Sequence, residues 1–195
     1  MQTLQEALPY KHWITAVGLD SSEVGNPPIK FQQVFAKALA EGWLTVAHAG
    51  EEGGAGYIWD ALKHLKISRV DHGNHAIEDE ALMQYLLAHH IPLTMCPLSN
   101  YKLKVQPDLS HHPLKKMLDR GLLVTVNSDD PAYFGGYINE NYLAIQKALN
   151  LSQAEIYKLA ENSFIASFLN EKEKTARLKL LSHYSQFLLP RQNEQ

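Results

Sequence analysis

The 195-residue sequence contains one cysteine, Cys96, which excludes an internal disulfide and every zinc site built from several cysteines. No apolar run approaches the ~20 residues of a membrane-spanning helix. The N-terminal segment MQTLQEALPYKHW lacks the apolar core of a signal peptide. The net charge of −3 supplies no basic surface for nucleic acid or for an anionic membrane. These absences predict a cytoplasmic protein that binds neither nucleic acid nor membrane.

The sequence does contain a regular alternation of apolar runs with segments of helical periodicity. Val34 and Ala38 fall on one face of such a segment, and Gly42 is placed to end it. Ser152 and Glu155 form a capping-box pattern that opens a later helix. The tail PRQNEQ is expected to fray. The runs that predict buried strands are 13–20, 43–48, 67–73, 91–97 and 122–130, and residues 171–188 predict the last helix.

This alternation predicts an α/β fold with parallel strands covered by helices, formed as a single domain over residues 1–195. An open doubly wound sheet and a (β/α)8 barrel are the two candidates. An open sheet concentrates its reactive side chains near one switch point, whereas a barrel carries them at the ends of several strands. Because every predicted strand ends on or beside such a residue, a barrel is favoured, although only five of its eight strands are present. These residues are Asp20, His48, His72, Cys96 and Asp129.

The segment HAGEEGGAGY places His48 at a strand end and Glu51 in the loop that follows. A neutral imidazole is a good metal ligand, and a nearby carboxylate is able to move protons. Taken alone, His48 is explained more simply as a hydrogen-bonded core histidine beside solvated glutamates. The glycines suggest a phosphate cradle, but neither G-x-G-x-x-G nor G-K-[ST] is present, and acidic residues at the mouth would repel phosphate.

Two further strand ends carry reactive side chains. His72 in RVDHGNH is a candidate base or water-positioning group, with a role in the turn before Gly73 as the alternative. Cys96 in CPLSN has no recognisable base partner, so a buried, inert thiol is the better interpretation. If the strands form one parallel sheet, then His48, Glu51, His72, Asp129 and Asp130 converge on one pocket. Histidine and aspartate ligands beside a glutamate and a second histidine suggest zinc-assisted attack of water on an electrophilic carbon.

Four motifs carry a family resemblance: TVAHAGEE, RVDHG, CPLSN and VNSDDPAYFGGY. In this order and spacing they resemble the adenosine and adenine deaminases of the amidohydrolase superfamily. GLDSSEVGNPP and SDDPAYFGGYINENY are more similar to the adenine branch than to the adenosine branch. The resemblance covers nearly the whole chain and implies a partial (β/α)8 barrel, strands four to eight. It also implies hydrolysis of adenine to hypoxanthine and ammonia in purine salvage.

The resemblance implies a role for each matched residue. His48 and Asp129 would bind one Zn²⁺ ion, and Glu51 would protonate a ring nitrogen of the purine. His72 would orient or deprotonate the attacking water, and Asp130 would hydrogen-bond the imidazole edge of the purine. Ser21, Ser22 and Glu23 occupy the loop that contacts the other side of the purine in the family, without individual roles. The alternative zinc deaminase design, with H-x-E and P-C-x-x-C, is excluded by the single cysteine.

The sequence departs from the family in one respect, because it contains no H-x-H pair, which supplies two further zinc ligands in the family. Two protein ligands would hold zinc weakly, since catalytic sites usually have three. We therefore expect little turnover by this chain alone, and self-association through open barrel edges. An adenosine deaminase and a non-catalytic remnant or interaction module remain the alternatives.

Overall fold

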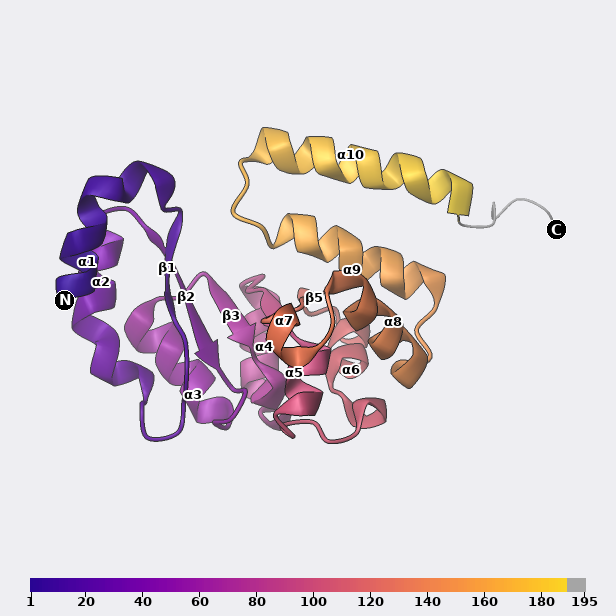
Figure 1. Cartoon of the computed structure of the whole chain (residues 1–195), viewed down its shortest axis with the longest axis horizontal. Coiled ribbons are helices and arrows are strands. Elements are labelled where there is room, and N and C mark those ends of the chain that lie inside the picture. Colours follow the sequence, from indigo (N-terminus) through magenta and orange to yellow (C-terminus); the bar gives the residue numbers. More distant parts are fainter. Residues whose placement is uncertain (189–195) are drawn as a thin grey trace. The chain divides into compact units, whose positions relative to one another are not determined.

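The computed structural model describes residues 1–188, so the predicted fraying of the PRQNEQ tail lies outside the described residues. Five short strands follow one another along the chain (Figure 1). They are β1 (Ala16–Leu19), β2 (Leu44–Ala49), β3 (Arg69–His72), β4 (Leu93–Met95) and β5 (Val124–Val126). Four of them lie inside the predicted apolar runs, and β2 extends one residue beyond its run, to Ala49. Strands alternate with helices, which confirms the predicted α/β class.

The chain divides into two compact units, and the single domain over residues 1–195 stays a prediction. The first unit comprises Met1–Met95 and Lys116–Leu123, and the second comprises Cys96–Lys115 and Val124–Gln195. In the first unit, β1 to β4 lie side by side in chain order, and each neighbouring pair among them is parallel. The register of β2 on β3 places His48 opposite Asp71 and Ala49 opposite His72.

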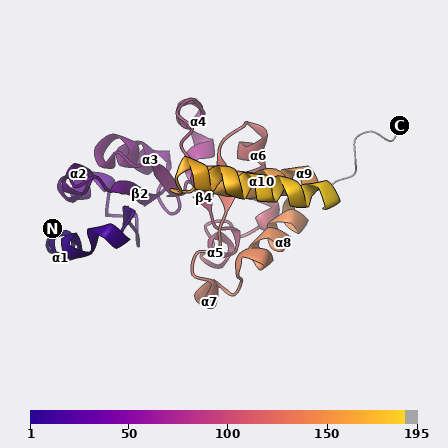
Figure 2. The same ribbon diagram turned by 90° about the horizontal axis from the view of Figure 1, so that it is seen from above.

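Helices cover the strands of the first unit. α2 and α3 pack on β2, and both lie beside it in the view from above (Figure 2). A small apolar cluster of Leu4, Ala38 and Trp43 joins the first helix to α2 and to the start of β2. The helices are α1 (Gln2–Ala7), η1 (Leu8–Trp13), η2 (Pro28–Phe31), α2 (Gln32–Ala40), α3 (Ala55–Asp60), η3 (Ala61–Leu65), η4 (Asn74–Glu78) and α4 (Glu80–Ala88).

The second unit is mostly helical. Its α9 packs on β5 and on α10, beside which it runs in both views (Figures 1 and 2). The predicted capping box at Ser152 and Glu155 is present in full, and the last helix has the predicted bounds. The helices are α5 (Pro97–Lys102), η5 (Leu109–His111), α7 (Pro131–Phe134), α8 (Ile138–Leu149), α9 (Gln153–Ile165) and α10 (Glu171–Leu188), while α6 (Leu114–Asp119) spans the boundary between the units.

Except for β2, the strands are shorter than the apolar runs that predict them, because the residues at the ends of those runs belong to turns or helices. Trp13 belongs to the 3-10 helix η1 rather than to β1, and it is 76% exposed. The two ends of the last run, Leu122 and Asp130, also lie outside β5. No helix among residues 1–188 is long and apolar enough to cross a membrane.

Candidate active site

The carboxyl ends of β2 and β3 bring two predicted site residues together. The rings of His48 and His72 lie edge to face with their centroids 4.5 Å apart. His72 has a φ of 66°, in the left-handed region that few non-glycine residues adopt. Such backbone strain is concentrated at functional sites, and the His72 side chain is buried there.

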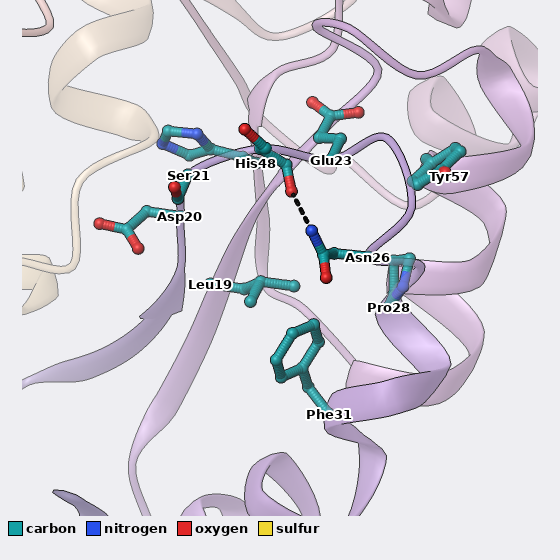
Figure 3. A pocket seen from close by; sticks show the side chains of 10 residues that line it. Leu19, Asp20, Ser21, Glu23, Asn26, Pro28, Phe31, His48 and Tyr57 are labelled. Atoms are coloured by element: carbon teal, nitrogen blue, oxygen red, sulfur yellow. Dashed lines mark hydrogen bonds between the residues drawn. The ribbon is translucent and has the colours of Figure 1, made fainter.

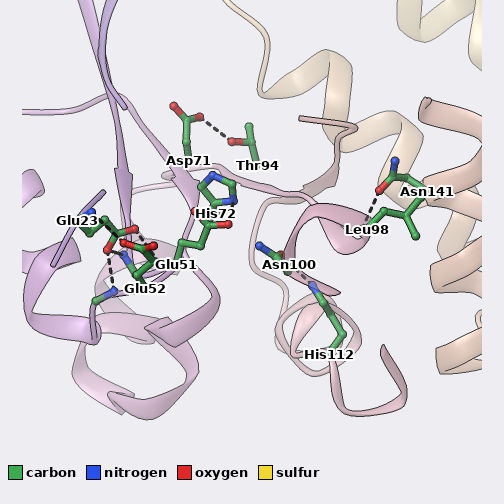
Figure 4. Close-up of polar contacts among 12 residues, drawn as sticks. Glu23, Glu51, Glu52, Asp71, His72, Thr94, Leu98, Asn100, His112 and Asn141 are labelled. Carbon is green, nitrogen blue, oxygen red and sulfur yellow. Dashed lines mark hydrogen bonds and ion pairs between the residues drawn. The ribbon is translucent and has the colours of Figure 1, made fainter. Parts of the chain in front are cut away.

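Glu51 completes a group of three possible metal or proton-transfer residues. Its Oε1 lies 3.3 Å from Nδ1 of His72 (Figure 4). His48, Glu51 and His72 each offer one ligand atom, and these atoms lie within 4.8 Å of one another. Glu51 and His72 are buried, whereas His48 is partly exposed. The nitrogen and oxygen donors suit a divalent metal such as zinc, and the burial strengthens every electrostatic interaction inside the site.

The loop after β2 depends on a glycine at its first position. Gly50 has a φ of +73°, and a Cβ there would lie 2.5 Å from Cδ1 of Ile58. Both the backbone conformation and the space therefore require glycine. His75 donates its backbone N–H to the carbonyl of Gly50, which joins this loop to the turn after β3. The glycine-rich segment thus forms a tight turn that carries Glu51.

Glu23, for which the sequence predicts no individual role, contacts the loop that carries Glu51. Its carboxylate accepts hydrogen bonds from the backbone amides of Gly50 and Glu51 at 2.9 Å and of Gly53 at 3.0 Å. A phosphate cradle would need these same amides, and here a carboxylate of the chain already occupies them. This contact agrees with the sequence argument against phosphate binding.

A cavity of about 290 Å³ lies beside these residues in the first unit (Figure 3). His48 and Glu23 face it from opposite sides, and Asn26 donates to the carbonyl of Ser22 at its wall. Phe31 supplies an apolar surface below. The cavity has the mixture of apolar walls and few polar groups that is typical of small-molecule sites. Its lining residues are Leu19, Asp20, Ser21, Ser22, Glu23, Asn26, Pro28, Phe31, His48 and Tyr57.

The remaining predicted site residues belong to the second unit. Asp129 follows β5 with a φ of 55°, so it also has a left-handed backbone. Asp130 caps α7 through its carbonyl, which accepts the amides of Tyr133 and Phe134 at 2.9 Å. Cys96 is 5% exposed, which confirms the prediction of a buried thiol. The proposed roles of Asp129 and Asp130 stay predictions of the sequence.

Two buried neutral groups hold the loops of the second unit. The ring of His112 accepts the amide of Leu114 on Nδ1 at 3.2 Å and contacts Oδ1 of Asn100 through Nε2 at 3.3 Å (Figure 4). Burial lowers the pKa of His112 from 6.5 to about 4, so its ring is neutral near pH 7. Asn141 accepts the amide of Leu98 and donates to the carbonyls of Gly136 and Tyr137.

Comparison with known proteins decides the family. The family model described as "Adenosine deaminase" matches residues 1–184. The chain belongs to the adenosine deaminase family. It is 59% identical over 174 residues to the adenine deaminase of Chlorobium phaeobacteroides, and 58% identical over 186 residues to that of Hahella chejuensis. These matches cover 89% and 95% of this chain but 52% and 56% of the relatives, so the chain spans about half the length of the curated relatives it matches.

Solved structures of the deaminase family confirm the predicted barrel-type fold. An adenine deaminase from Arthrobacter aurescens is 44% identical, with a TM-score of 0.92 over 95% of this chain and 57% of its own. An amidohydrolase from Burkholderia ambifaria with bound zinc is 27% identical, with a TM-score of 0.82 over 88% of this chain and 48% of its own. The resemblance read from the four sequence motifs is therefore confirmed at the level of family and fold.

Proposed function

We propose that this chain carries part of the active site of an adenine deaminase, which hydrolyses adenine to hypoxanthine and ammonia. In this reaction the bond between the ring carbon and the amino nitrogen breaks, and a bond from that carbon to the oxygen of water forms. The observation that carries the proposal is the buried contact between Glu51 and His72 beside His48. The names of the relatives at 58–59% identity support adenine as the substrate.

The residues of the first unit would divide the proton transfers between them. Glu51 would give a proton to the ring nitrogen next to the attacked carbon, because the amino group leaves only after the ring has accepted a proton. His72 would orient the attacking water or take its proton, and the distance of 3.3 Å between Nδ1 of His72 and Oε1 of Glu51 supports a shared role in proton transfer. The cavity of about 290 Å³ beside His48 would exclude bulk water from the purine.

We propose Zn²⁺ as the cofactor, with His48 as one ligand. The donor atoms of His48, Glu51 and His72 are of the type that zinc prefers, and the related amidohydrolase from Burkholderia ambifaria has zinc bound. When bound, zinc lowers the pKa of a coordinated water to ~7. Asp129 as a further ligand and Asp130 as the partner of the purine imidazole edge are proposed from the sequence motifs alone.

Adenosine deamination is the second candidate, because the matching family model carries that description. A chimeric protein distinguishes the two reactions. The matched half of the Chlorobium phaeobacteroides adenine deaminase is replaced by residues of this chain, and ammonia release is measured with adenine and with adenosine. We expect adenine to be strongly preferred. A preference for adenosine would overturn the substrate, and a zinc-loaded chimera without turnover would favour the non-catalytic alternative.

The chain on its own is expected to turn over adenine poorly and to self-associate. In the part of the chain that the structure describes, β1 stands at one end of the strand order and pairs with β2. A free strand edge is a template for pairing with another chain. Light scattering across a concentration series measures the association, and a monomer at every concentration would contradict it. Cytoplasmic localisation stays a prediction of the sequence.

A further inference from the structure

Glu23 is buried in a loop whose other residues face solvent. Its exposed fraction is 4%, whereas the neighbouring Ser22 and Val24 are exposed. A buried carboxylate is costly unless hydrogen bonds compensate for the lost water. The burial of Glu23 therefore requires a compensating group of donors, and the structure contains one.

The donors are three amides of one short loop. The two carboxylate oxygens of Glu23 accept from Gly50, Glu51 and Gly53, with Oε1 taking Glu51 and Oε2 taking the two glycines (Figure 4). Hydrogen bonds to an ionised acceptor are roughly twice as strong as neutral ones. The amide of Glu51 itself is one of the three, so Glu23 fixes the backbone from which the Glu51 side chain extends.

The contact is reciprocal and needs a small residue at its centre. Glu52 accepts the backbone amide of Glu23 at 3.2 Å, so each loop holds the backbone of the other. A Cβ on Gly53 would lie 2.6 Å from Cδ2 of Tyr57 and 2.8 Å from Oε2 of Glu23, closer than real Cβ atoms approach. On the adjacent Gly54 a Cβ would meet nothing within 4 Å.

We propose that Glu23 is a positioning residue, which fixes the loop 50–53 and thereby holds the Glu51 carboxyl against His72. The proposal rests on the proposed function only for the role of Glu51 as the acid. Both oxygens of the Glu23 carboxylate accept hydrogen bonds from the three amides of the loop. A glutamine at position 23 would offer one oxygen and turn its NH2 group toward a donor, which leaves a buried amide without an acceptor.

The first test measures hydrogen exchange of individual amides by NMR and needs neither zinc nor substrate. Glu23→Gln should speed exchange at Gly50, Glu51 and Gly53 at least tenfold, while the amide of Gly73, which donates to Ala49, keeps its protection. Glu52→Gln is the matched control, because it removes a charge from the same loop and leaves an acceptor for Glu23. Unchanged exchange at the three amides, or equal acceleration at Gly73, would overturn the proposal.

Two further variants separate positioning from folding. Glu23→Ala leaves a space lined by three donors, so acetate should restore protection of the three amides in a concentration-dependent way. Gly53→Ala should loosen the same amides, whereas Gly54→Ala should leave them unchanged. Acetate without effect on Glu23→Ala, or equal effects of the two alanines, would show that the side chain of Glu23 acts only through general packing.

The consequence for catalysis is measured in the Chlorobium chimera. Glu23→Gln should lower kcat at least tenfold and change KM less, with zinc content unchanged. Faster amide exchange with normal kcat would contradict the role of Glu51 as the acid and leave the loop contact standing. Unchanged amide exchange would contradict the positioning role itself. The failure of this inference is thus distinguishable from the failure of the proposed function.

Discussion

The two units fix the loops at their strand ends with opposite chemistry. In the first unit a carboxylate, Glu23, receives three backbone amides beside the buried Glu51 and His72. In the second unit the same task falls to neutral groups, the amide of Asn141 and the imidazole of His112. A buried carboxylate thus fixes the loop beside the proposed proton-transfer residues of the first unit, whereas neutral side chains fix the loops of the second unit.

This difference follows from the hydrogen-bond donors and acceptors that surround each buried side chain. A carboxylate suits a loop that offers donors only, such as the three amides around Glu23. A side-chain amide suits a position that offers one donor and two acceptors, as Leu98, Gly136 and Tyr137 do for Asn141. Replacing the carboxylate by an amide in the first unit, or the amide by a carboxylate in the second, should therefore destabilise the unit concerned.

Introducing a charge into the second unit should have the largest effect. Asn141→Asp would turn a carboxylate toward the carbonyls of Gly136 and Tyr137, and an uncompensated buried charge costs about 3–5 kcal/mol. Asn139→Asp is the control on the exposed side of α8 and should change stability by less than about 0.5 kcal/mol. Hydrogen exchange of the second unit, followed by mass spectrometry, measures both. If Asn141→Asp and Asn139→Asp changed the exchange equally, the second unit would tolerate a buried carboxylate at position 141, and the contrast with the first unit would be wrong.

The neutral His112 should make the second unit acid-sensitive. Its pKa is lowered from 6.5 to about 4 in the fold, so the unfolded chain binds a proton first as the pH falls. The free energy of unfolding should therefore drop between pH 6.5 and pH 4 by ~1.4 kcal/mol per unit, about 3 kcal/mol in all. His112→Asn should abolish this slope in hydrogen exchange, and His111→Asn, at an exposed histidine, should keep it. A slope that survives His112→Asn would refute the assignment.

The turn that carries Glu51 should tolerate no side chain at position 50. Gly50→Ala combines a left-handed φ with a clash against Ile58, for an expected loss of about 2 kcal/mol. Gly25→Ala has a similar φ of +80° with open space around it, so it should lose about 1 kcal/mol. Urea unfolding followed by tryptophan fluorescence is suited to this pair, because all three tryptophans belong to the first unit. Equal losses would mean that Ile58 imposes no constraint.

The smallest loss of stability is expected at the start of α9, away from the hydrogen bonds of Glu23, His112 and Asn141. Ser152→Ala removes the hydroxyl that accepts the amide of Glu155, and loss of such a cap costs ~1 kcal/mol. Gln153→Ala, one residue further along the same turn, should be nearly neutral. The rates of amide hydrogen exchange within α9 are compared between the two variants. Unchanged rates in Ser152→Ala would show that packing on β5 alone stabilises the helix.

The strands were predictable from the sequence, because short runs with many apolar residues alternate with segments of helical periodicity, which is typical of a parallel sheet covered by helices. The helix α8 was not predicted. Its buried face is formed largely by Asn141 and Ile145, and an asparagine gives no apolar period. The helix α5 was missed because its start, Pro97, was interpreted as the end of a strand. A proline is equally suited to the first position of a helix.

Among the predicted site residues, His48 and His72 stand at the ends of apolar runs and Glu51 lies in the loop after His48, which is why the sequence singles them out, and the structure brings the three close together. Glu23 received no role, because its partners are backbone amides, which leave no mark in a sequence. One signal was present, a single acidic residue between SS and VG in a short loop before a proline pair. Only the fold shows that this loop meets the loop 50–53.

The central claim is that Glu51 supplies the proton that permits the amino group to leave. The most direct test compares ammonia release from adenine by the zinc-loaded Chlorobium chimera with that of its Glu51→Gln form. We predict equal zinc content and a rate lower by ~10²–10⁴, the usual contribution of a general acid. A Glu51→Gln chimera that releases ammonia at a near-normal rate would contradict the claim.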